Sequence, residues 1–166
     1  LCSYRERIQG DGQRIEKESL ARHITVSARA VEEIKQRKEP IPTVFEIETA
    51  LAFLYFKEKK CDLAIVETGL GGALDATNVI KTTLLEVITP IGLDHMDVLG
   101  KTLGEIAGQK AGIIKTGTRV VTAAQDPEAR EVLVHKCQEE NCILGQVEPE
   151  HLRDIHYGWD KQSFSY

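Results

Sequence analysis

DLAIVETGLGG, residues 62–72, is the stretch that decides the fold class of this chain. It begins as a short, β-prone apolar run and stops at the charged Glu67 and a glycine-rich loop. A short apolar run bounded by turn residues is typical of a strand buried in a sheet. Similar runs follow at residues 84–89, 119–123 and 142–147, so the sequence predicts several strands.

Helical patterns precede and separate these runs. Thr102 and Glu105 have the spacing of a capping box, which opens a helix. Another helix is predicted over residues 126–140, where an aspartate precedes a proline at the first helical position. Upstream, the apolar patterns predict helices over residues 16–37 and 45–59. Strands that alternate with helices predict an α/β fold with a mostly parallel sheet and helices on both of its faces.

The composition is that of a globular chain, and the length suits one domain or one large piece of a domain. Its 166 residues include 26 acidic and 21 basic side chains, and 42% of them are hydrophobic. This balance argues against intrinsic disorder, and no apolar run approaches the roughly 20 residues of a membrane helix. A net charge of −5 without a Lys/Arg cluster indicates neither nucleic acid nor an anionic membrane as a partner.

The cysteines and the two ends of the chain carry weaker signals. Cys2, Cys61, Cys137 and Cys142 form neither a CxxC pair nor a Cys/His metal-binding spacing. Because no signal peptide precedes them, we expect a reduced, cytoplasmic setting. The chain begins with leucine instead of methionine, which predicts a processed chain or a piece of a longer one. The polar and aromatic tail, residues 151–166, predicts at most an edge strand.

Two predicted strands end in unusual polar residues, and ligands bind beyond the carboxyl ends of strands in open parallel sheets. Glu67 is either a partly exposed glutamate that pairs with a lysine or caps a helix, or a ligand for a hard cation such as Mg²⁺. His95 follows the run at 84–89 and lies between Asp94 and Asp97. It is either a solvated loop histidine or, with Glu67, part of one shared site.

The glycine-rich loop and a nearby lysine add to these candidates. Residues 69–72 allow close approach of a ligand to the backbone, although tight-turn glycines would look the same. Leu74 stands where a dinucleotide fingerprint needs glycine. Residues 95–102 end like a P-loop, but they begin with histidine and carry Asp97 where backbone amides should cradle phosphate. Lys110 is either a partly buried nucleophilic amine or a helix lysine whose stem covers apolar surface.

Four segments, taken together, resemble one family. Residues 43–46 read TVFE, residues 67–78 read ETGLGGALDATN, residues 91–95 read IGLDH and residues 109–115 read QKAGIIK. In this order and spacing they resemble the folylpolyglutamate synthase/dihydrofolate synthase family of the Mur ligase group. The likeness extends from the first residue to about residue 125.

The resemblance implies an ATP- and Mg²⁺-dependent amide ligase. Such enzymes phosphorylate a carboxylate of dihydropteroate or folate with ATP, and the amino group of L-glutamate attacks the acyl phosphate. Residues 1–166 would form a partial ATPase (central) domain of the Mur ligase type, without the P-loop and the C-terminal domain. We expect such a piece to be inactive alone and to form oligomers through an exposed sheet edge. The alternative is a non-catalytic remnant that binds a pterin or a protein partner.

The resemblance also implies roles for individual residues. Glu67 and His95 match metal-binding positions of the family, and Lys110 matches a lysine that many members carry as a carbamate. Positions that contact the pteroate substrate in the family correspond to Thr43, Val44, Phe45, Glu46, Leu74, Asp75 and Ala76. Further loop contacts are expected at Gly71, Gly72 and Asn78.

Overall fold

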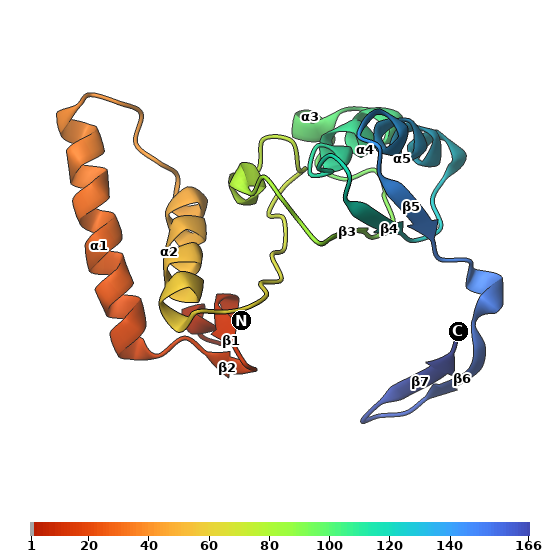
Figure 1. The fold of residues 1–166 in the computed structure, drawn as a ribbon, viewed down its shortest axis with the longest axis horizontal. Coiled ribbons are helices and arrows are strands. Elements are labelled where there is room, and N and C mark those ends of the chain that lie inside the picture. Colours follow the sequence, from red (N-terminus) through yellow and green to blue (C-terminus); the bar gives the residue numbers. More distant parts are fainter. Residues whose placement is uncertain (1) are drawn as a thin grey trace. The chain divides into compact units, whose positions relative to one another are not determined.

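The computed structural model describes residues 2–166, which divide into two compact units. Among the described residues, the first unit comprises residues 2–69 and the second comprises residues 70–166. Figure 1 shows both units as ribbons, with the first in red to yellow and the second in green to blue. Each unit has its own buried apolar cluster and is described by itself.

The first unit is a small hairpin followed by two helices. Its elements are η1 (Tyr4–Arg7), β1 (Gln9–Gly10), β2 (Gln13–Arg14), α1 (Lys17–Gln36) and α2 (Val44–Lys59). The two short strands pair antiparallel, and α1 packs beside α2 (Figure 1). Both helices confirm the ranges predicted from the apolar pattern.

The core of the first unit lies between the hairpin and the two helices. Its fully buried members are Ile8, Ile15, Leu51 and Tyr55. At the edge of this core, Lys59 donates to Oε1 of Glu16 at 2.7 Å. This hydrogen bond is the main reason why the pKa of Glu16 falls from 4.5 to about 2.

The predicted strand at residues 62–67 is wrong for this structure. The segment is extended but belongs to none of the three sheets among the described residues. Leu63 is 62% exposed and Ile65 is 90% exposed. A strand exists only where a neighbouring strand exchanges hydrogen bonds with it, and no described segment does so here.

The second unit is built on a parallel sheet. Its strands β3 (Leu85–Ile88), β4 (Arg119–Thr122) and β5 (Ile143–Gln146) run in the order β3-β4-β5. The helices of this unit are α3 (Met96–Leu99), α4 (Leu103–Ala111) and α5 (Pro127–Glu139), with the short turns η2 (Ala76–Val79) and η3 (Pro149–His151). The three predicted strands after residue 80 and the α/β class are therefore confirmed.

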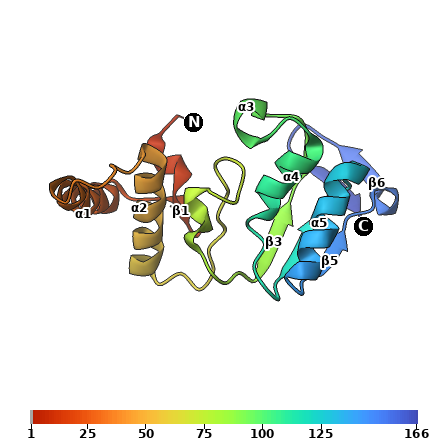
Figure 2. The same cartoon turned by 90° about the horizontal axis from the view of Figure 1, so that it is seen from above.

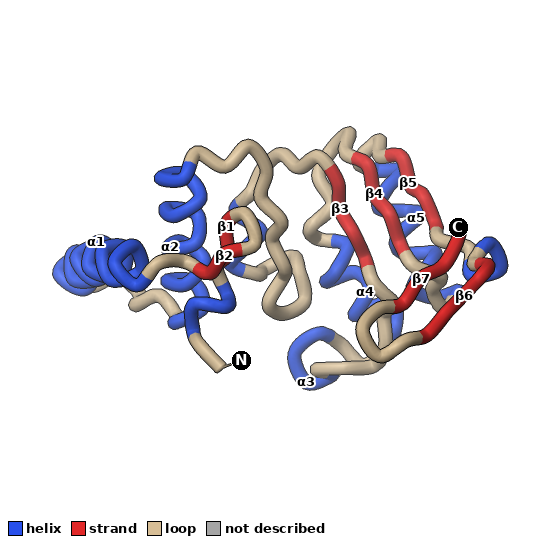
Figure 3. The backbone as a smooth tube through the Cα atoms, turned by 90° about the horizontal axis from the view of Figure 1, so that it is seen from below, coloured by secondary structure: helices blue, strands red, loops and turns tan. Residues whose placement is uncertain are grey.

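Helices α4 and α5 pack against each other and form one layer on the sheet (Figures 2 and 3). The buried cluster between helices and sheet includes Ile88, Ile106, Val120 and Leu133. On the opposite face of the same sheet, Leu85 and other apolar side chains are exposed. In the described part of this unit, helices thus cover one of the two sheet faces.

Local signals set the ends of these helices. Thr102 and Glu105 form the predicted capping box at the start of α4, with reciprocal side-chain and backbone hydrogen bonds. Asp126 accepts a hydrogen bond from the backbone of Glu128 and precedes a proline at the start of α5. Both helix starts therefore agree with the sequence.

The tail differs from its prediction as an edge strand. Strands β6 (Arg153–Tyr157) and β7 (Gln162–Ser165) form an antiparallel hairpin of their own, seen in blue in Figure 1. A turn that begins at Gly158 lets the two strands of the tail pair with each other. The backbone N–H of Gly158 donates to the carbonyl of Lys161 across this turn. No helix within residues 2–166 has the length and apolar character to cross a membrane. All four cysteines are free thiols.

We expect the Glu16–Lys59 pair to make the stability of the first unit depend on pH in the acidic range. Because folding lowers the pKa of Glu16, its contribution is complete above pH 4.5 and is lost as the pH falls toward 2. Glu16→Gln should flatten the dependence of the urea midpoint on pH in this range. Glu18→Gln, in the first turn of α1, is the control and should keep the wild-type dependence on pH. A wild-type dependence on pH in Glu16→Gln would contradict the assignment.

Candidate functional site

The glycine loop of the second unit lies directly on the C-terminal end of α4. Ala73 N donates to the carbonyl of Gln109 at 2.8 Å, which joins the loop to the helix backbone. A Cβ built on Gly72 would lie 2.7 Å from that same carbonyl and 2.9 Å from the carbonyl of Lys110. A Cβ on Gly112 would lie 2.4 Å from Cβ of Ala73. The glycines on both sides are therefore required for this close approach.

A positive φ imposes a further requirement at Gly71. Its φ is 68°, a left-handed conformation that glycine adopts without steric cost. Here a Cβ would lie 2.8 Å from Cδ2 of Leu99. The sequence left open whether these glycines bind a ligand or only shape a turn, and the geometry gives Gly71 and Gly72 a packing role.

Asp75 organises the loop with its own carboxylate. Its Oδ2 accepts from the backbone N–H of Leu70, and its Oδ1 accepts from both the backbone and the hydroxyl of Thr77. Ala76 begins the short turn η2 directly after it. Leu74, next to Asp75, is 95% exposed at the tip of the loop. Of the predicted substrate contacts in this loop, Leu74 thus has the most accessible side chain.

Lys110 lies in the last turn of α4 and is half-buried. The same helix buries Ile106, Ala107 and Ala111 completely, so its position is set by the core. The carbonyl of Lys110 faces Gly72, as described above, and accepts from the backbone N–H of Ile113. The structure thus brings Lys110 and the glycine loop together in one unit.

His95 has an unusual backbone conformation at the start of α3. Its φ of 49° lies in the left-handed region, which costs a non-glycine residue roughly 1–2 kcal/mol. Its backbone N–H donates to Oδ1 of Asp94, and its Nε2 lies 3.6 Å from Oδ2 of the same residue. The imidazole is exposed. Such strained positions cluster at functional sites, which favours a role for His95 beyond the cap.

The segment from His95 to Thr102 does not cradle phosphate. The backbone N–H groups of Lys101 and Thr102 both donate to Oε2 of Glu105. These are the donors that a P-loop would direct at phosphate oxygens. The Gly-Lys-Thr ending therefore belongs to the cap of α4, as its departures from the P-loop pattern indicated.

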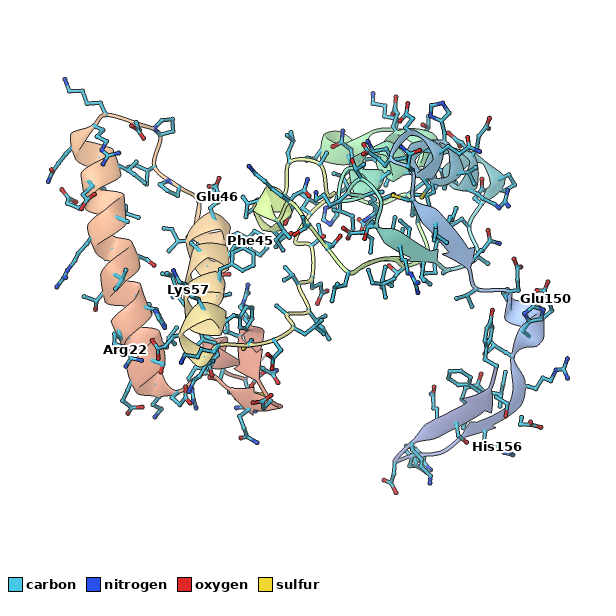
Figure 4. The ribbon with its side chains drawn as sticks, viewed as in Figure 1. Arg22, Phe45, Glu46, Lys57, Glu150 and His156 are labelled. Carbon is cyan, nitrogen blue, oxygen red and sulfur yellow. The ribbon has the colours of Figure 1, made fainter. Side chains whose placement is uncertain are left out.

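Four candidate substrate residues of the first unit lie at the start of α2, and Figure 4 labels two of them, Phe45 and Glu46. Thr43 and Glu46 form a second capping box: Thr43 N donates to Oε2 of Glu46, and Glu46 N donates to Oγ1 of Thr43. The hydrogen bonds from Thr43 lower the pKa of Glu46. Val44 is exposed and Phe45 is half-buried. The structure thus explains Thr43 and Glu46 by helix capping.

Glu67 is an exposed carboxylate near the end of the first unit. Within residues 2–166, no three His, Cys, Asp or Glu side chains converge in a way that could hold a metal ion. The exposed carboxylate of Glu67 suits Mg²⁺, because this cation prefers oxygen donors, binds few protein ligands and keeps several waters, whereas the imidazole of His95 is a less typical donor for it.

Two further positioning contacts were not predicted. Gln125 donates from Nε2 to the carbonyl of Thr89 and accepts at Oε1 from the backbone N–H of Ile91. This side chain therefore holds the loop that leads from β3 to His95. Lys115 donates to Oδ1 of Asn78, a residue predicted only as a loop contact. No motif marks Gln125 for this contact, because Thr89 and Ile91 are more than thirty positions away in the sequence.

Comparison with known proteins gives consistent matches in sequence and structure. Dihydrofolate synthase/folylpolyglutamate synthase of Bacillus subtilis is 48% identical over 139 residues, which cover 83% of this chain and 32% of the relative. Folylpolyglutamate synthase of Arabidopsis thaliana is 40% identical over 149 residues, which cover 90% of this chain and 26% of the relative. No family model matches the chain.

A solved FPGS–AMPPCP–folate complex superposes on this chain with a TM-score of 0.90 and 33% identity. The match covers 98% of this chain and 40% of that one. Fold and sequence thus agree on the α/β class that this chain shares with these structures. The chain belongs to the folylpolyglutamate synthase/dihydrofolate synthase family. It spans between a quarter and a third of the length of these two curated relatives.

Gly72→Ala should destabilise the second unit, because the new methyl group would collide with the backbone of α4. We expect the free energy of unfolding to fall by about 1–3 kcal/mol, as for other overpacked sites. Chemical denaturation measures this change.

Gly108→Ala is the matched control, since it adds the same methyl group in α4 at a place where no atom beyond the local helix backbone and the adjacent residues lies within 4 Å. It should leave the stability unchanged or raise it by up to about 1 kcal/mol. Equal effects of the two substitutions would show that the loop does not pack on the helix as described.

Proposed function

We propose that this chain is part of an ATP- and Mg²⁺-dependent ligase that joins L-glutamate to dihydropteroate, to folates or to both. The observation that carries the proposal is the match to the FPGS–AMPPCP–folate complex over 98% of this chain. That complex contains an ATP analogue together with folate, as its name states. The 48% identity to the Bacillus subtilis dihydrofolate synthase/folylpolyglutamate synthase supports the same reaction class.

The chemistry requires activation of a carboxylate. A carboxylate is a poor electrophile, so transfer of the γ-phosphoryl group of ATP to it supplies a leaving group. The amino group of glutamate then attacks the acyl carbon, and phosphate leaves as the amide bond forms. Bound Mg²⁺ would offset the negative charge on the phosphate oxygens in both steps.

Residues of this chain take defined parts in the proposal. Glu67 would contribute a carboxylate and His95 an imidazole to the metal, as the motif match implies. Lys110 would act as a carbamate, which converts a cationic side chain into an anionic one beside the metal. This change is compatible with its half-buried place on a rigid helix.

The substrate side of the proposal concerns one loop in each unit: the loop that precedes α2 in the first unit and the loop that precedes η2 in the second. Leu74 offers an exposed apolar side chain, and Val44 offers another. Apolar surface of this kind suits the flat ring of a pterin. The carboxylates of Glu46 and Asp75 hold their own loops in shape, so they would act by presenting these surfaces.

Glu67→Gln in the complete gene product that contains this chain should lower kcat by about a hundredfold, because a proposed metal ligand loses its charge. Release of phosphate from ATP in the presence of folate and glutamate measures the rate. Glu131→Gln, an exposed glutamate of α5, is the control and should retain wild-type activity. Near-normal turnover of Glu67→Gln would remove this residue from the site.

Lys110→Ala should lose activity and regain part of it when short carboxylic acids are added. Such an acid can replace the anionic end of a carbamate in the space that the side chain leaves. Turnover is measured with acetate and, as the control for ionic strength, with chloride. A folded variant that acetate does not rescue would mean that Lys110 has only a structural role.

A further inference from the structure

Lys115 and Asn78 are joined across the second unit by a charge-assisted hydrogen bond. The ammonium of Lys115 donates to Oδ1 of Asn78, although the two residues lie 37 positions apart in the sequence. The backbone of Lys115 is itself anchored, since its carbonyl accepts from the backbone N–H of Thr118 and from Sγ of Cys142. Lys115 therefore reaches Asn78 from a fixed position.

The amide of Asn78 connects the glycine loop to the end of α4. Its Nδ2 donates to the carbonyl of Ala73 at 3.0 Å and to the carbonyl of Gly112 at 3.1 Å. With Oδ1 bonded to Lys115, both donors of this amide and its acceptor are in use. One side chain thus holds two backbone segments together.

The cation of Lys115 decides which way the amide of Asn78 points. An ammonium has donors only, so it can face the oxygen of the amide but not its nitrogen. That choice directs the NH₂ group toward the two carbonyls, and the positive charge strengthens both donors by polarising the amide. Loss of the Lys115 charge would therefore weaken the bonds to Ala73 and Gly112 as well.

We propose that Lys115 and Asn78 are positioning residues, which hold the loop of Leu74 and Asp75 in register with the helix turn that carries Lys110. Ala73 is the link, because its N–H is bonded to Gln109 and its carbonyl to Asn78. This proposal rests on the proposed function for the role of Lys110. The register itself is a property of the fold that can be measured without any reaction.

Two readouts separate positioning from general stability. Hydrogen exchange of the peptide spanning residues 70–77 reports whether the loop stays on α4, and it needs no substrate. The changes in kcat and in the KM for folate, compared with each other, report whether turnover suffers more than substrate binding. Both are measured in the complete gene product that contains this chain.

Lys115→Met keeps the apolar stem of the side chain and removes its donor. We expect residues 70–77 to exchange about tenfold faster and kcat to fall about tenfold, while the KM for folate changes by less than about threefold. Lys115→Arg retains a donor for Asn78 and should restore most of both values. Lys161→Met, which removes an exposed lysine of the C-terminal hairpin, is the control and should change neither.

Asn78→Asp tests the geometry if Lys115→Met folds poorly. The new carboxylate keeps an ion pair with Lys115, so the protein should remain folded, but it cannot donate to Ala73 or Gly112. Fast exchange of residues 70–77 with a normal melting temperature would support the proposal. Wild-type exchange in Asn78→Asp or in a folded Lys115→Met would overturn it.

Measurements of ligase activity distinguish a failure of the proposed function from a failure of the positioning role. If the wild-type protein lacks ligase activity, the proposed function fails while the exchange result still decides whether the pair sets the register. If exchange accelerates but kcat is unchanged in an active enzyme, the positioning role in the reaction is overturned.

Discussion

Direct contact between the backbones of the glycine loop and α4 is the constraint on which the second unit depends. A Cβ atom would prevent this close approach, so glycine is required at position 72 on the loop and at position 112 at the end of the helix. The hydrogen bond from Ala73 to Gln109 then fixes the register. Because α4 packs into the buried core of this unit, the loop that is bonded to α4 is held in a fixed position as well.

This arrangement suits a site that must hold charged groups in place. Side chains on rigid elements are held more precisely than those on free loops. Lys110 lies in the last turn of α4. In the loop beside it, the carboxylate of Asp75 accepts hydrogen bonds from the backbone N–H groups of Leu70 and Thr77. His95 is fixed differently, by a left-handed turn and a loop that Gln125 holds. In the second unit, the segments that carry the candidate residues are thus held in place by hydrogen bonds of their own.

The first unit shows how local and non-local information differ. The capping box of Thr43 and Glu46 forms because both partners lie within one helical turn. The apolar segment at residues 62–67 has an equally clear pattern, yet it forms no strand, because strand formation depends on a partner that sequence periodicity does not name. Leu63 and Ile65 lie in this β-prone segment, but both are exposed and neither belongs to a strand.

The sequence by itself determined the α/β class, the three parallel strands of the second unit, the helix starts at Thr102 and Asp126, and the family. These features depend on short-range patterns or on motifs that are continuous in the chain. Only the tertiary structure decided that Gly71 and Gly72 pack on a helix, that Asn78 pairs with Lys115, and that Gln125 holds the loop of His95. The physical reason is distance along the chain: such contacts join residues that lie far apart in the sequence, and only folding brings them together.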